Sequence, residues 1–205
     1  MEDSVFDLTV QNATVEDRIV ASLEKVSEAF RVLLWAESKR TGLSPIQVQL
    51  LVFLLYQPTV RATVTVLARE FNMTKPTVSD AIKVLERKGL VVRTGNEADN
   101  RSYTLSLTAN GRDVAESSGV FANVIKHQVR TLEASQQSGL LQALLEVIHL
   151  LQKTGVIHTQ RMCKTCRFFA PGKGKVKHYC ALMRQTLHGA DLRLDCPEHV
   201  LAVSA

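Results

Sequence analysis

Residues 74–93 read TKPTVSDAIKVLERKGLVVR, and this stretch decides the fold of the 205-residue chain. Its apolar residues recur at the spacing of one buried helix face: Val78, Ala81, Ile82 and Leu85. Thr74 is a favourable N-cap for this helix, and Gly89 is a favourable residue just beyond its end. The stretch therefore predicts a helix over 74–88, followed directly by a strand from Leu90 to Arg93.

A short helix precedes this stretch and a second strand follows it. Residues 63–71 have the pattern of a short helix, with Thr63 as its N-cap. Residues 103–107 alternate between apolar and polar side chains, as a half-buried strand does. A polar turn over 94–101 joins the two strands. Two short helices, a tight turn and a hairpin with a charged tip describe a winged helix-turn-helix.

The outward side chains of this predicted unit suit double-stranded DNA. A helix with small polar and basic side chains near its N-terminus can enter the major groove, where base edges are distinguishable. A wing tipped by Arg101 can place a cation in the minor groove, with Asp99 orienting its guanidinium. Asp80 cannot contact phosphate, but it can accept from a cytosine amine or pair with Lys83. The candidate DNA-contacting residues are Thr74, Lys75, Pro76, Thr77, Ser79, Asp80, Lys83, Arg93, Asp99 and Arg101. Helix 74–88 taken alone is equally consistent with an ordinary solvated helix, and the ordered combination of elements favours DNA binding.

Four further helices are predicted around this unit. They span 18–40, 45–56, 108–132 and 135–153, the second with a Ser44–Gln47 capping box and the third with Thr108 as its N-cap. The last helix carries more leucine and valine than one face of a small domain can cover. A helical homodimer interface is the simplest interpretation. The fold class is thus mainly α with a small β-wing.

Composition and charge exclude several classes of protein. The chain is 45% hydrophobic and 22% charged, which argues against a disordered or fibrous protein. We find neither a transmembrane stretch nor a secretory signal, and therefore expect a cytoplasmic protein without a membrane partner. The net charge is +5, and residues 161–205 supply all of it, with eight basic and three acidic side chains. The segment that holds this charge also holds all four cysteines.

These cysteines predict a metal site. Cys163 and Cys166 form a C-x2-C pair, and Cys180 and Cys196 follow after 13 and 15 residues. Four thiolates complete a closed tetrahedral Zn²⁺ site, which is the favoured interpretation, and the metal would stabilise a segment with little core of its own. A 4Fe-4S cluster is the main alternative, since Cys196-Pro197 resembles the end of ferredoxin ligand runs, and a thiol–disulfide switch is a third. Histidines 178, 188 and 199 are better interpreted as surface or partly packed residues than as ligands.

Several motifs together resemble the MarR family of bacterial transcriptional regulators. They are Leu67-Ala68-Arg69-Glu70, Pro76-Thr77-Val78-Ser79, Leu85 to Arg93, Asp99-Asn100-Arg101 and Leu107 to Gly111. The resemblance covers residues 18–153 and implies a homodimer on a pseudo-palindromic operator. It also implies a ligand cleft for a small-molecule effector. Two departures stand out: Asp80 occupies a position where members often carry Arg, and the chain continues about fifty residues beyond the family's usual end.

The sequence thus predicts a regulator built of three parts. Residues 1–17 form an acidic arm, 18–153 the MarR-like domain with its winged helix-turn-helix core at 61–108, and 154–205 a four-cysteine metal module. We expect no enzymatic activity, because no nucleophile–base set, phosphate-binding glycine loop or carboxylate pair is recognisable. Two alternatives stay open: a regulator whose cluster senses iron, oxygen or redox state, and a redox enzyme or electron carrier on a winged-helix scaffold.

Overall fold

The computed structural model describes residues 4–57, 61–96, 99–158, 161–172 and 177–202, and it divides into two compact units, Met1–Ile125 and Lys126–Ala205. The division falls inside a helix, upstream of the boundary near Gly155 that the composition suggests. The segment that contains the cysteines therefore belongs to one compact unit with the last long helix. Secondary structure is mainly helical with two small antiparallel sheets, which confirms the expected fold class.

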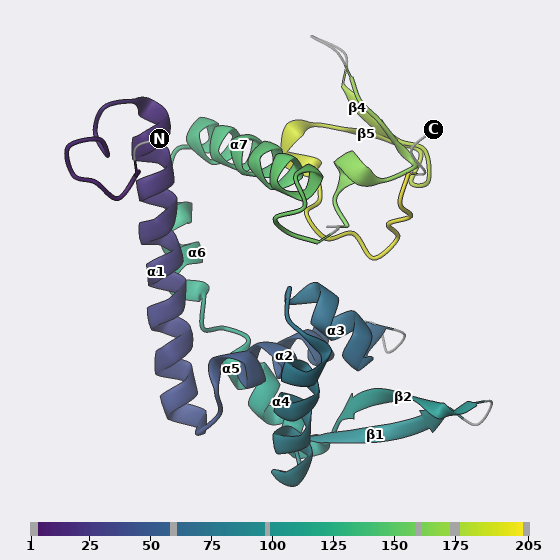
Figure 1. Ribbon diagram of the computed structural model, residues 1–205. Coiled ribbons are helices and arrows are strands. Elements are labelled where there is room, and N and C mark those ends of the chain that lie inside the picture. Colours follow the sequence, from purple (N-terminus) through teal and green to yellow (C-terminus); the bar gives the residue numbers. More distant parts are fainter. Residues whose placement is uncertain (1–3, 58–60, 97–98, 159–160, 173–176, 203–205) are drawn as a thin grey trace. The chain divides into compact units, whose positions relative to one another are not determined.

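Unit 1 begins with the long helix α1 (Val15–Thr41), drawn in purple in Figure 1. It starts earlier than the apolar pattern suggests, because the Thr14 side chain accepts a hydrogen bond from the Asp17 backbone N–H. Gly42 ends the helix in the left-handed region, with φ 65°. Much of its apolar surface is exposed in the single chain, including Phe30 and Trp35 at 41% and 55%.

The core of unit 1 forms around α2 (Pro45–Tyr56), which packs against α1, α4, α5 and β2. As the sequence predicts, the Ser44 backbone N–H donates to the Gln47 Oε1 at the start of α2, at 2.9 Å. Val48, Leu50 and Leu51 are fully buried. Helix α3 (Val64–Glu70), helix α4 (Lys75–Arg87) and the hairpin β1 (Val91–Asn96) and β2 (Asp99–Leu107) complete the winged helix-turn-helix.

The single helix expected over 108–132 is wrong. The chain forms α5 (Ala109–Ser118) and α6 (Asn123–Arg130), separated by turns. Gly119 explains part of the break, since glycine is a poor helix former and its missing Cβ leaves room for Tyr56. A Cβ at Gly119 would lie 3.2 Å from the Tyr56 hydroxyl. The interruption thus lets the end of α5 pack beneath α2.

A second glycine sets how closely α5 approaches the start of the wing. A Cβ at Gly111 would lie 1.9 Å from the carbonyl oxygen of Leu90. The Thr108 hydroxyl holds the same junction, because it donates to the Gly89 carbonyl at 2.7 Å and accepts from the Gly111 N–H at 2.9 Å. The first turn of α5 therefore lies directly on the residues that lead into β1.

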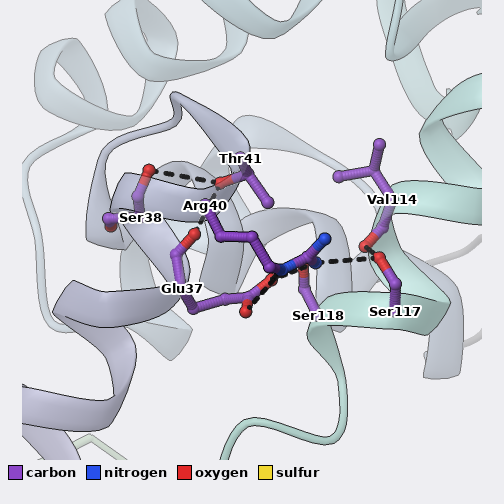
Figure 2. A network of polar contacts seen from close by, with 7 residues as sticks. All are labelled: Glu37, Ser38, Arg40, Thr41, Val114, Ser117 and Ser118. Atoms are coloured by element: carbon purple, nitrogen blue, oxygen red, sulfur yellow. Dashed lines mark hydrogen bonds and ion pairs between the residues drawn. The ribbon is translucent and has the colours of Figure 1, made fainter.

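A network of polar contacts joins the end of α1 to α5 (Figure 2). The Arg40 guanidinium pairs with the Glu37 carboxylate, with Nε 3.0 Å from Oε2, and also donates to the Ser117 hydroxyl at 3.0 Å. The fully buried Ser118 donates to Glu37 Oε1 at 2.7 Å. These hydrogen bonds lower the pKa of Glu37, chiefly through Arg40. The carboxylate is thus held charged in a position that fixes α1 against α5.

Unit 2 contains α7 (Ala134–Lys153), two short 3-10 turns η2 (Cys163–Thr165) and η3 (Gly189–Asp191), and a three-stranded sheet. The sheet pairs β3 (Phe169–Ala170), β4 (His178–Cys180) and β5 (Gln185–Leu187) antiparallel, in that order. The Lys164 ammonium contacts the Glu146 carboxylate of α7, and η3 packs against the same helix. Met162 and Leu187 are almost fully buried.

Within the described part of the chain, the helices are all too short or too polar to cross a membrane.

Candidate nucleic-acid interface and four-cysteine site

The turn between α3 and α4 is built by short local bonds. The Thr63 hydroxyl caps α3 by accepting from the Val66 N–H at 3.3 Å. Asn72 then takes the left-handed region, with φ 50°, and the Met73 N–H donates to the Ala68 carbonyl at 2.8 Å. Asparagine tolerates that conformation better than most residues. The turn reverses the chain within a few residues and presents the N-terminus of α4.

The apolar face of α4 is buried as its spacing predicts: Val78, Ala81, Ile82 and Leu85. The opposite side carries the predicted DNA-contacting side chains. Lys75, Pro76 and Thr77 are exposed at the start of the helix, and Ser79 is half-buried. The side chains that can meet a ligand are therefore short, polar or cationic, and they gather on the first two turns.

Two of these side chains are already engaged within the helix. The Thr74 hydroxyl accepts from the Thr77 N–H at 3.3 Å and lies 2.7 Å from the Thr77 hydroxyl. Thr74 is thus an N-cap, as the sequence predicts. The Asp80 carboxylate pairs with the Lys83 ammonium at 2.9 Å, the second of the two roles considered for that acid. The pairing offsets its negative charge on the exposed face.

Arg93 at the base of the wing has partners that the sequence does not reveal. Its guanidinium binds both oxygens of the Glu86 carboxylate, at 2.7 and 2.9 Å, and stacks on the Tyr103 ring at 4.5 Å from the centroid. A bidentate ion pair and a cation–π contact hold it between α4 and β2. The backbone of Asp99 and Arg101 lies in β2, but their side chains lie outside the described residues.

In unit 2, all four cysteines line one cavity of about 30 Å³. They come from four separate pieces of chain: Cys163 from η2, Cys166 just after it, Cys180 from the end of β4 and Cys196 from the following loop. All four are free thiols. Apolar side chains form most of the remaining lining: Phe168, Phe169, Leu182, Met183 and Leu187. The fold thus brings together residues that are up to 33 positions apart in the sequence.

Backbone bonds hold the cysteine loops in place. The Cys163 N–H donates to the Arg193 carbonyl at 3.0 Å, and the Cys196 N–H donates to the Arg161 carbonyl at 2.9 Å. In return the Arg193 N–H donates to the Cys163 Sγ at 3.2 Å. Burial raises the pKa of the Cys163 thiol, the neighbouring cysteines add to that rise, and the Arg193 N–H opposes it.

The four cysteines border a shared cavity without converging on one point. Among the described residues, no group of three or more His, Cys, Asp or Glu side chains is placed closely enough to hold a metal ion. Two of the histidines in the same segment have other partners. The His199 Nε2 lies 2.9 Å from the Thr165 hydroxyl, and the His178 Nδ1 accepts from the Gly172 N–H at 3.0 Å.

A second cavity, of about 350 Å³, lies in unit 1 where α1 meets α2. Phe30, Leu34 and Trp35 supply an apolar wall from α1. Arg31 adds a cation and Gln49 of α2 an amide. This lining can hold a small organic molecule with an aromatic or anionic group.

Comparison with known proteins identifies the class of fold. Residues 41–102 match the model of the MarR family. The crystal structure of the S. aureus MepR–DNA complex matches with a TM-score of 0.57 and 21% identity, over 64% of this chain and 97% of that chain. S. aureus MepR in its DNA-binding conformation matches with a TM-score of 0.58 and 21% identity, over 65% and 98%.

The fold is therefore a MarR-type winged helix, which confirms the resemblance for the matched segment. None of the curated proteins compared with the chain matches it in sequence. The structural matches leave about a third of this chain outside the likeness.

Proposed function

We propose that this protein is a transcriptional regulator that binds double-stranded DNA through α4 and the β1–β2 wing. One observation carries the proposal: the first turns of α4 expose Lys75, Pro76 and Thr77 directly after a tight turn from α3. A helix presented in this way can enter the major groove with its N-terminal residues toward the base edges. The expected chemistry is binding, without catalysis.

Charge on the exposed face supports this proposal. Lys75 and Lys83 both lie on the exposed side of α4, and Asp80 is paired with Lys83. Lys75 at the helix N-terminus adds its own charge to the positive end of the helix dipole, which favours a phosphate there. Within residues 61–101 the balance is eight basic to five acidic side chains. This is a moderate excess, as expected where a few phosphate contacts position a helix.

A homodimer is the assembly that we infer. Helix α1 exposes Ile19, Val26 and Trp35 at 50%, 49% and 55%, a larger apolar surface than a monomer usually leaves in water. Helix α7 in unit 2 likewise exposes Leu140, Leu150 and Leu151 at 42%, 51% and 39%. A second copy that covers such helices would give two recognition helices related by a two-fold axis. Its operator would then be pseudo-palindromic.

Two ligand roles complete the proposed function. The cavity between α1 and α2 is the candidate site for a small-molecule effector, because it lies beside the exposed face of α1. The four cysteines of unit 2 are proposed to bind a metal centre, for which the sequence favours zinc. Shared access of four thiols to one cavity supports this second role. A metal centre would also supply the stability that a segment of short strands lacks.

The DNA-binding proposal is tested on the full chain with DNA from beside its own gene. We expect the protein to protect a site with approximate two-fold symmetry and Lys75→Ala to weaken binding by roughly tenfold, because a phosphate contact of this kind contributes on the order of 1 kcal/mol. The slope of log affinity against log salt should fall by about one per site lost. Lys39→Ala, at an exposed lysine in the last turn of α1, is the matched control. Equal loss in both variants, or no protected site at all, would refute the proposal.

A further inference from the structure

We propose that the four-cysteine cavity holds a polynuclear iron–sulfur cluster of the 4Fe-4S class and not a single zinc ion. The inference rests on the metal-binding part of the proposed function and specifies the group bound. It is independent of DNA binding by α4. Three features of unit 2 support it: the size of the cavity, its apolar lining and the hydrogen bonds that reach the cysteine sulfurs.

The size of the cavity distinguishes the two kinds of centre. In a tetrathiolate zinc site each sulfur lies about 2.3 Å from the metal, so neighbouring sulfurs are roughly 3.8 Å apart. That is van der Waals contact, and it leaves no void among the four sulfurs. Here the cavity bordered by all four cysteines measures about 30 Å³. A void needs only about 10–15 Å³ on this scale to admit a water molecule. The space is therefore wider than a closed zinc site.

The lining of the cavity suits a cluster. A single zinc ion is enclosed by its own four ligands and needs no further wall. A cluster carries bridging sulfides between its irons, and these sulfides meet the protein directly. Two aromatic and three aliphatic residues are available for that contact: Phe168, Phe169, Leu182, Met183 and Leu187. Their side chains also exclude water, which is one of the levers that proteins use on cluster potential.

Hydrogen bonds to the sulfurs form the third feature. The Arg193 backbone N–H donates to the Cys163 Sγ at 3.2 Å, and the Arg193 guanidinium reaches the Cys196 Sγ at 3.7 Å. Four thiolates around a 4Fe-4S core of charge +2 give a net charge of about −2, which a cation alongside offsets. Arg193 thus supplies both a positive charge and N–H donors to two of the four proposed ligands.

Assembly of the cluster balances without an added oxidant. Two ferrous and two ferric ions with four sulfides make a core of charge +2. Each of the four cysteine thiols then releases its proton to solvent and forms one Fe–S bond. Ferrous and ferric iron in equal amounts, with sulfide, are therefore the probe for reconstitution.

The first test is the metal content of the full chain, purified without oxygen from cells supplied with both iron and zinc. We expect about four iron and four acid-labile sulfide per chain, with broad visible absorption. About one zinc per chain without sulfide would overturn the cluster and leave metal binding intact. A metal-free chain would overturn both. In each case DNA binding is measured separately by footprinting, so failure of that proposal is recognised independently.

A second test separates the two centres by variants that keep all four cysteines. Leu182→Trp fills the cavity and should lower iron and sulfide content at least about twofold, while zinc offered to the metal-free chain still binds. Retained zinc binding also shows that the variant folds. Tyr179→Phe, beside Cys180 but outside the cavity lining, is the matched control and should keep its iron. Full iron and sulfide content in Leu182→Trp would overturn the assignment of this cavity to the cluster.

Discussion

Replacing Gly111 by alanine should displace α5 from the start of the wing and destabilise unit 1. The new Cβ would lie 1.9 Å from the Leu90 carbonyl oxygen and 2.8 Å from its carbonyl carbon. Ordinary contact begins at about 3.5 Å, so helix or strand must move by roughly 1.5 Å. The obstacle is backbone, and rotation of a side chain cannot relieve it.

The magnitude follows from what such a shift disturbs. Overpacking of this kind costs about 1–3 kcal/mol, whereas the better helix propensity of alanine returns about 1 kcal/mol. Movement at this point also strains the bonds that the Thr108 N–H and hydroxyl donate to the Leu90 and Gly89 carbonyls, at 3.1 and 2.7 Å. Each contributes roughly 1 kcal/mol. We expect a net loss of about 2–4 kcal/mol in the free energy of unfolding.

The assay uses the single tryptophan of the chain, Trp35, which lies in α1 of the same unit. Urea unfolding followed by its fluorescence therefore reports unit 1 directly. Gly95→Ala is the matched control, because a Cβ there would have no atom within 4 Å, and its effect should stay within about 0.5 kcal/mol. If Gly111→Ala unfolds at the same urea concentration as the wild-type chain, the inferred close approach of α5 is wrong.

Two further predictions concern the cap of α4 and the network at the end of α1. Thr74→Ala should cost about 1 kcal/mol in stability and weaken DNA binding, because the Thr77 N–H loses its acceptor, whereas Thr74→Ser should restore both; urea unfolding and a binding titration check this, and equal behaviour of the two variants would contradict it. At Glu37 the pairing with Arg40 holds the folded-state pKa below its ordinary value of 4.5. The resulting stabilisation is complete above about pH 4.5 and disappears as pH falls through the lowered pKa. Glu37→Gln should therefore lower stability at pH 7 and flatten its decline toward acid, as measured by Trp35 fluorescence at a series of pH values; an unchanged slope would count against the pairing.

Much of the winged helix could be predicted because local signals and burial agree there. The caps at Thr63, Thr74 and Thr108 all form as expected. The apolar spacing of α4 marks its buried face, and the alternation over 103–107 marks the inner strand of the wing. In such segments each residue's own preference agrees with the packing around it.

Other features depend on contacts between distant residues. The Glu86–Arg93 pair and the contact of Glu37 with Ser118 join segments 7 and 81 positions apart, and periodicity carries no signal for them. The break at Gly119 depends on Tyr56, which lies in another helix. The three strands of unit 2 are two or three residues long, too short to alternate. The cysteine spacing indicated a shared site but not the width of its cavity.

Lys164 occupies the middle of the C-x2-C loop and contacts Glu146 of α7, the helix whose exposed leucines are proposed to meet a second copy. If both proposals hold, cofactor loading and subunit association draw on one set of contacts in unit 2. Thermodynamic reciprocity then requires that each favour or oppose the other by the same factor. The cofactor affinity would depend on protein concentration, and the dimer dissociation constant on cofactor supply. A cell could thus adjust the amount of active dimer through the availability of iron and sulfide, without a change in the amount of the protein.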